Sequence, residues 1–87
     1  MATVFIPSLM RTLSGGQDRV EVPGATVRQI VKNLDEIFPG MQDRLTENGR
    51  LKAAFSVAVD SEVSQLGILE KVREDSEVHF LNAIAGG

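Results

Sequence analysis

Few side chains in this chain are of the types that carry out chemistry. The 87 residues include no cysteine and one histidine, which excludes a disulfide framework, a thiolate nucleophile and a cysteine-ligated zinc site. His79 has no nucleophile near it in the sequence, so we interpret it as a surface or contact residue rather than a general base. We therefore predict that the chain is not an enzyme and binds no metal or cofactor of its own.

The remaining candidate for chemistry is the end of the sequence, Ala85-Gly86-Gly87, whose last residue offers an α-carboxylate. Glycine has no Cβ, so the backbone at Gly86 and Gly87 can approach another molecule closely. At an average glycine usage of ~7%, two glycines end a chain by chance in roughly one case in two hundred, and a frayed end without a role is the alternative. We predict that residues 82–87 form a flexible tail, which spans about 20 Å when extended.

The composition predicts one small globular domain. A hydrophobic share of 43%, a charged share of 24% and a net charge of -3 suit a folded chain with one modest core. We expect no nucleic-acid partner, because no basic stripe with interleaved aromatic residues is present. We expect no membrane association, because no apolar run approaches the ~20 residues that span a bilayer. The N-terminal residues do not resemble a signal peptide, so a cytoplasmic location is expected.

The first half of the chain predicts two strands and a helix. Thr3–Met10 and Arg19–Val22 are rich in β-branched or alternating apolar residues, and the Ser14–Asp18 turn between them predicts an antiparallel hairpin. Thr26 is a good N-cap with Gln29 three residues later, as in a capping box. One apolar helical stripe follows, formed by Val27, Ile30, Val31, Leu34, Ile37 and Phe38.

The second half returns to strands. Met41–Leu45 predicts one further helical turn and Thr46–Arg50 a polar turn. Phe55–Val59 alternates with a period of two, which directs Phe55, Val57 and Val59 inward. A short strand and a loop are expected within Val63–Leu69. Glu77–Leu81 is the last predicted strand, with Val78 and Phe80 facing inward.

This order predicts an α+β fold of the ubiquitin-like β-grasp kind over residues 1–81. One main helix packs on one face of a mixed sheet of four to five strands. The preference for right-handed crossovers places the last strand parallel to the first and beside it. One helix leaves the other face open, where Phe5, His79 and Leu81 are expected to form a partly apolar patch that binds a partner. Scattered surface residues without a role are the alternative.

The sequence contains, in this order, the segments Val4–Ile6, Leu9–Arg11, Glu21–Val27, Phe38–Gly40, Val57–Asp60, Asp75–Val78 and Ala85–Gly87. Together they resemble a known family, the ubiquitin-like sulfur carriers of the MoaD/ThiS type. Two segments differ from the molybdopterin-synthase small subunits, which usually have Gly-Asp-Glu-Val where Asp75–Val78 stands and prolines where Asn82-Ala83-Ile84 stands. Ser14–Gln17 is similar to the hairpin of carriers that serve cysteine synthesis.

The resemblance implies a role for Gly87. An E1-like adenylating enzyme would use Mg-ATP to transfer AMP onto the Gly87 carboxylate, and a sulfur nucleophile would then displace AMP and leave a thiocarboxylate. A synthase would accept the sulfur, either cysteine synthase-like or similar to the molybdopterin-synthase large subunit. Ile84, Ala85 and Gly86 would contact these partners. Two alternatives stay open, a modifier conjugated to lysines through Gly87 and a ubiquitin-like binding domain whose tail has no role.

Overall fold

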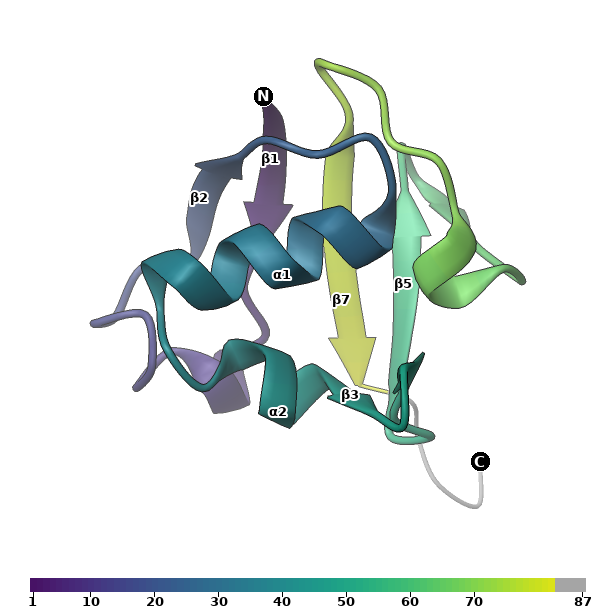
Figure 1. Cartoon of the computed structure of the whole chain (residues 1–87). Helices are drawn as coiled ribbons and strands as arrows, with labels where there is room; N and C mark the ends of the chain where they lie inside the picture. The colour runs from purple at the N-terminus through teal and green to yellow at the C-terminus, as the bar shows by residue number, and fades with distance from the viewer. Residues whose placement is uncertain (83–87) are drawn as a thin grey trace.

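A five-stranded mixed sheet is the centre of the fold in the computed structural model, which describes residues 1–82 (Figure 1). The strand order is β2-β1-β7-β5-β6. β1 pairs antiparallel with β2 and parallel with β7, and β7 pairs antiparallel with β5. The parallel first and last strands confirm the predicted β-grasp arrangement. The strands are β1 (Ala2–Phe5), β2 (Arg19–Val22), β5 (Phe55–Val59), β6 (Glu62–Val63) and β7 (Glu77–Asn82).

The helix α1 (Val27–Ile37) crosses one face of this sheet (Figure 1). Its predicted N-cap is confirmed, because the Thr26 hydroxyl oxygen accepts a hydrogen bond from the Gln29 backbone N–H at 3.2 Å. The reciprocal bond differs from a standard capping box, since the Gln29 side chain accepts from Ala25 N–H at 2.8 Å rather than from the cap residue itself. The last helical residue is Ile37. Phe38 follows it with an extended backbone (φ of -126°), because the next residue is Pro39, which disfavours helical geometry in the residue before it.

The core lies between α1 and the sheet. The apolar stripe of α1 meets inward residues of the central strands through its buried members Val27, Ile30, Val31 and Leu34. Ile37, predicted as part of this stripe, is instead 45% exposed. Phe55 and Val59 pack partly buried against the core, as the alternation predicted. Burying this area is the main stabilising contribution to a domain of this size. The largest fully buried side chains include Met10, Ile30, Leu34, Met41, Leu45, Val4, Val22, Val57 and Val78.

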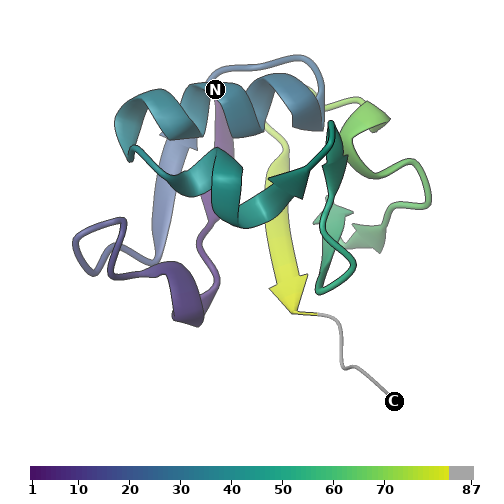
Figure 2. The same ribbon diagram turned by 60° about the horizontal axis from the view of Figure 1, so that its bottom comes forward.

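Short elements extend the helical side of the sheet (Figure 2). They are α2 (Met41–Leu45), β3 (Thr46–Glu47), β4 (Arg50–Leu51) and the 3₁₀ helix η2 (Gly67–Leu69). β3 and β4 form a small antiparallel hairpin around Asn48-Gly49, where only a polar turn was predicted. Both turn residues have positive φ, 53° and 76°, which is the geometry of the tight turns that Asn-Gly favours.

The prediction of one strand over Thr3–Met10 is wrong beyond Phe5. β1 ends there, and Ser8–Met10 forms the 3₁₀ helix η1. The physical cause is Pro7, which has no N–H to continue the ladder with β2. Its carbonyl instead accepts a hydrogen bond from Met10 N–H at 2.9 Å. The turn directs Met10 into the core, where it is 2% exposed.

Candidate functional site: the open face of the sheet

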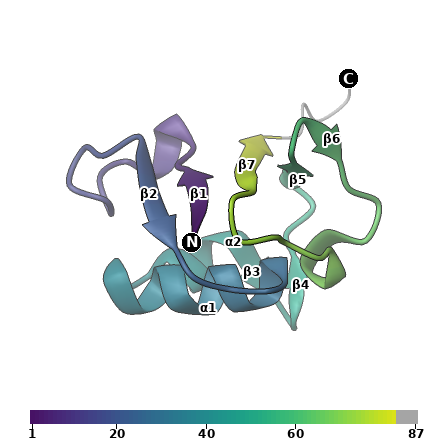
Figure 3. The same ribbon diagram turned by 90° about the horizontal axis from the view of Figure 1, so that it is seen from above.

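The candidate site is the sheet face opposite α1, called here the open face. Figure 3 shows α1 on one side of the strands only. Successive residues of a strand point to opposite faces. Val78 and Phe80 of β7 are therefore buried under the helix, whereas His79 is half-buried and Leu81 is exposed on the open face.

Phe5 and His79 form the centre of the open face. They are register partners in the parallel β1–β7 pair, and their rings stack with centroids 4.0 Å apart and planes within 5°. Such a contact stabilises both rings and fixes their orientation. The structure thus brings together two of the three predicted patch residues as one stacked pair.

Leu81 lies along β7 from this pair and is 42% exposed. Its register partner on β5 is Ser56, and the partner of His79 is Ala58. Ser56 and Ala58 are small; Ala58 is buried beside His79, whereas Leu81 stays exposed beside Ser56. Sequence reasoning missed these two contributors, although the inward alternation of Phe55, Val57 and Val59 already places the residues between them on the opposite face.

Charged groups surround this apolar centre. The Glu77 carboxylate lies 3.5 Å from His79 Nε2, and Arg19 is the register partner of Phe5 on β2. Glu21 accepts a hydrogen bond from the Thr3 hydroxyl at 3.3 Å. An apolar centre with a charged rim is the usual composition of a protein-binding surface. His79 contacts the Phe5 ring and lies 3.5 Å from the Glu77 carboxylate, so it forms part of this surface.

Further predicted site residues follow β7. The structure describes the chain as far as Asn82, which pairs with Phe55 of β5 and ends the strand one residue later than predicted. Ile84, Ala85, Gly86 and Gly87 lie outside the described residues.

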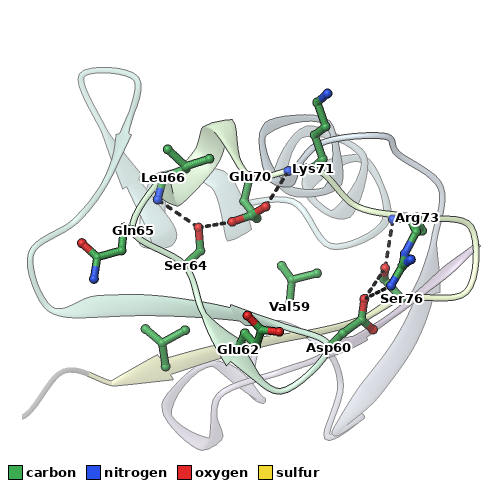
Figure 4. A pocket seen from close by; sticks show the side chains of 11 residues that line it. Val59, Asp60, Glu62, Ser64, Gln65, Leu66, Glu70, Lys71, Arg73 and Ser76 are labelled. Atoms are coloured by element: carbon green, nitrogen blue, oxygen red, sulfur yellow. Dashed lines mark hydrogen bonds and ion pairs between the residues drawn. The ribbon is translucent and has the colours of Figure 1, made fainter.

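A network around Asp60 fixes the other end of β7 (Figure 4). The Asp60 carboxylate accepts hydrogen bonds from Glu77 N–H at 2.9 Å and from the Ser76 hydroxyl at 2.8 Å. The first bond, the second bond and the Arg73 guanidinium at 3.7 Å lower the pKa of Asp60 from its ordinary value of 3.8. The network therefore positions β7 against the β5–β6 turn.

The hollow beside this network has a volume of about 590 Å³. Its polar groups bond mainly to one another, as in the 2.6 Å bond from the Ser64 hydroxyl to Glu70 (Figure 4). Within residues 1–82, no group of three or more His, Cys, Asp or Glu side chains is placed to hold a metal ion. Over the same residues, no helix has the length and apolar character needed to cross a bilayer.

A mixed sheet with parallel first and last strands, one long helix across it and an uncovered second face defines the class of ubiquitin-like β-grasp domains. The sequence model of the ThiS family matches residues 4–87, and the chain belongs to this family.

Individual relatives agree with this assignment. The sulfur carrier protein CysO of Mycobacterium tuberculosis (strain H37Rv) is 29% identical over 90 residues, which cover 98% of this chain and 97% of CysO. A chain in the crystal structure of the Amycolatopsis orientalis BexX/CysO complex is 32% identical, with a TM-score of 0.92 and full coverage of both chains. The small archaeal modifier protein SAMP1 of Methanosarcina acetivorans has a TM-score of 0.81 at 16% identity, covering 99% of this chain and 95% of SAMP1, which shows a shared fold alone.

Proposed function

We propose that this chain is a sulfur carrier whose working group is the Gly87 carboxylate. The observation that supports this proposal most strongly is the similarity to the sulfur carrier protein CysO along 98% of the chain. The sequence also places Gly86 and Gly87 at the end of the tail that follows β7. The partner that accepts the sulfur would be a cysteine-forming synthase, in keeping with this similarity and with the Ser14–Gln17 hairpin.

The chemistry requires a second protein. A carboxylate is a poor electrophile, because its charge is delocalised and its oxygens are poor leaving groups. Transfer of AMP from Mg-ATP releases pyrophosphate and converts the carboxylate to a mixed anhydride. A sulfur nucleophile then attacks the Gly87 carbonyl carbon, AMP leaves, and a thiocarboxylate forms. The body contributes binding and orientation, while the adenylating partner contributes the catalytic groups.

The open face would dock on the adenylating partner. Phe5, His79 and Leu81 provide an apolar contact surface at the end of the sheet to which the tail is joined. Docking through this face holds the body while the residues after Asn82 enter the partner's nucleotide site. Glycine at positions 86 and 87 permits a close approach of the backbone to ATP.

The decisive experiment is detection of the thiocarboxylate. The protein is incubated with a ThiS-type adenylating enzyme, Mg-ATP and sulfide, and its intact mass is measured before and after treatment with iodoacetamide. Because the chain has no cysteine, a single alkylation identifies a C-terminal thiocarboxylate and distinguishes it from oxidation of a methionine. The same spectrum verifies that the mature protein ends at Gly87. Absence of alkylation under conditions that load a control carrier would contradict the proposal.

Gly87→Ala tests the close approach at the nucleotide. The added methyl group should slow adenylation by at least about tenfold, equivalent to a barrier increase of about 1.4 kcal/mol, with unchanged thermal unfolding. Pyrophosphate release measures the rate. An unchanged rate would remove the steric role of the terminal glycine.

Leu81→Glu tests docking through the open face. A charge in an apolar contact should weaken binding to the adenylating enzyme by about tenfold or more, as measured by calorimetry. Ile37→Glu is the matched control, because Ile37 is 45% exposed against 42% for Leu81 and belongs to the helix on the other face. Equal affinities for the two variants would exclude the open face as the docking surface.

The modifier alternative begins with the same Gly87 adenylate. It predicts isopeptide conjugates to lysine, visible in cells as a ladder of larger species that carry the chain. The likeness to SAMP1 supports it only at the level of the fold. A ladder that disappears in Gly87→Ala, without detectable thiocarboxylate, would replace the carrier proposal by this one.

A further inference from the structure

A second surface lies on the helical side of the sheet, between η2, the β3–β4 hairpin and the first turn of α1 (Figure 2). These elements border a groove of about 450 Å³, called here the lateral groove. Its apolar lining consists of leucine and isoleucine side chains, and its only charged lining residues in the described chain are two arginines. The lining includes the side chains of Arg28, Arg50, Leu51, Leu66, Ile68 and Leu69.

The local geometry of η2 explains why two leucines remain outside the core. Side chains three residues apart nearly eclipse one another in a 3₁₀ helix, so Leu66 and Leu69 lie on the same side. They are 58% and 64% exposed. Ile68, between them, packs against the core together with Leu51. Ile68 thus anchors η2 to the core, whereas Leu66, the residue before η2, and Leu69 form an exposed apolar pair.

The charge of the lateral groove contrasts with that of the protein. The chain has a net charge of -3, yet no carboxylate side chain lines the groove. The ion pairs found within residues 1–82 include neither Arg28 nor Arg50. Glu47 is the register partner of Arg50 in the hairpin without forming an ion pair with it.

The position of Arg28 is unfavourable for the helix itself. It occupies the first turn of α1, which contains no acidic residue, and a cation there meets the positive end of the helix dipole. Helix stability therefore does not account for an arginine at this position. A bound carboxylate would relieve the unfavourable interaction and would complement both guanidinium groups.

From this arrangement we propose that the lateral groove binds an acidic segment of a partner protein. One apolar side chain of the segment would lie between Leu66 and Leu69, and flanking carboxylates would pair with Arg28 and Arg50. A membrane fits less well, because the groove is concave and a body of net charge -3 is repelled by anionic lipid. The groove lies on the opposite side of the sheet from Phe5 and His79, so this partner can bind while the open face is occupied. The proposal does not depend on sulfur transfer.

The test uses the full-length chain labelled with ¹⁵N and a synthetic peptide, acetyl-Leu-Glu-Glu-Leu-Leu-Glu-Glu-Leu-amide. Titration should shift the amide signals of Gly49, Leu51, Leu66 and Leu69 in preference to those of the open face. The peptide with glutamine in place of glutamate should bind at least about tenfold more weakly, which corresponds to about 1.4 kcal/mol.

Variants separate charge from apolar contact. Arg28→Glu/Arg50→Glu should weaken peptide binding by at least about tenfold, whereas the charge reversal Arg11→Glu, outside both the lateral groove and the open face, should leave peptide binding unchanged. Leu66→Ser/Leu69→Ser should also weaken peptide binding, although both arginines remain in this variant. Recovery of affinity between Arg28→Glu/Arg50→Glu and a lysine version of the peptide would support direct pairing.

Four results would overturn the proposal. The first is equal binding of the glutamate and glutamine peptides, and the second is an absence of shifts at millimolar peptide. The third is a concentration-dependent shift of the groove signals without peptide, which would identify a second copy of the chain as the occupant. The fourth is a response to phosphatidylserine–phosphatidylcholine vesicles in place of the peptide, which would identify a membrane.

Discussion

The two faces of strands β1 and β7 are built from neighbouring residues but differ in their physical role. Val4, Val78 and Phe80 are 0%, 0% and 3% exposed beneath α1. Phe5 and His79 occupy the alternate positions, stack on each other and remain half-buried without a covering helix. One strand can therefore contribute both to the core and to an interface, because its side chains alternate between the two faces.

This division predicts that substitutions one residue apart in β7 have separate consequences. Changes on the covered face should reduce the free energy of unfolding, and changes on the open face should mainly affect binding. The predictions that follow test the division, beginning with the largest expected effect.

The strongest test compares Phe80→Ala with Leu81→Ala. Removal of the buried Phe80 ring leaves a cavity and should lower the free energy of unfolding by about 3–5 kcal/mol. Leu81 is already 42% exposed, so its truncation should cost less than about 1 kcal/mol. Urea unfolding measures both values. Similar losses for the two variants would show that the open face also serves as core.

An intermediate effect is expected for the stacked pair. A double-mutant cycle with Phe5→Leu and His79→Gln should give a coupling free energy of about 0.5–1.5 kcal/mol, the range for aromatic pairs. Urea unfolding of the four proteins supplies the cycle. If the effects of the two single substitutions were strictly additive, the ring contact would contribute no stability. The pairing of β1 with β7 would then be the only reason that the rings lie together.

The smallest effect concerns the pH dependence of the Asp60 network, because this carboxylate is exposed and water screens its interactions. The pKa of Asp60 is lowered in the folded state by the bonds from Glu77 N–H and the Ser76 hydroxyl. The ionised group therefore contributes stability above its ordinary pKa of 3.8, and this contribution is lost as the pH falls through the folded-state value.

Asp60→Asn removes the ionisation and keeps an oxygen that accepts hydrogen bonds. The difference in unfolding free energy between the native protein and this variant should be constant near neutral pH and should shrink in acid below about pH 4. Thermal unfolding across this pH range measures the difference. A difference that stays constant in acid would show that the charge of Asp60 has no part in holding β7.

Much of the fold could be predicted because the patterns were local. The apolar stripe of α1 and the Thr26 cap depend on residues within a few positions of one another. The cap matches the structure, and so does the stripe except at Ile37, which is 45% exposed. The alternation in Phe55–Val59 likewise assigned its inward face correctly. The extension of the first strand to Met10 failed because the β propensity of its residues was weighted above the missing N–H of Pro7.

The open face was only partly predictable. Alternation alone places Phe5, His79 and Leu81 on one side, but their neighbours depend on register between distant strands. The pairing of Ala58 with His79 and of Val63 with Ala58 comes from the sheet, and no local pattern specifies it. The lateral groove was missed for the same reason, since Arg28, Arg50 and Leu66 belong to segments far apart in the sequence.

The position of β7 in the sheet has a consequence for biosynthesis. It lies between β1 and β5 although it follows both in the sequence. On the ribosome, β1 and β5 therefore lack the strand that joins them until Glu77–Asn82 has been synthesised. The pairing of β1 and β5 with β7 must therefore wait until this segment has left the ribosome, as for other topologies dominated by long-range contacts. A product terminated before Glu77 would lack the central strand of the sheet and would be open to proteolysis.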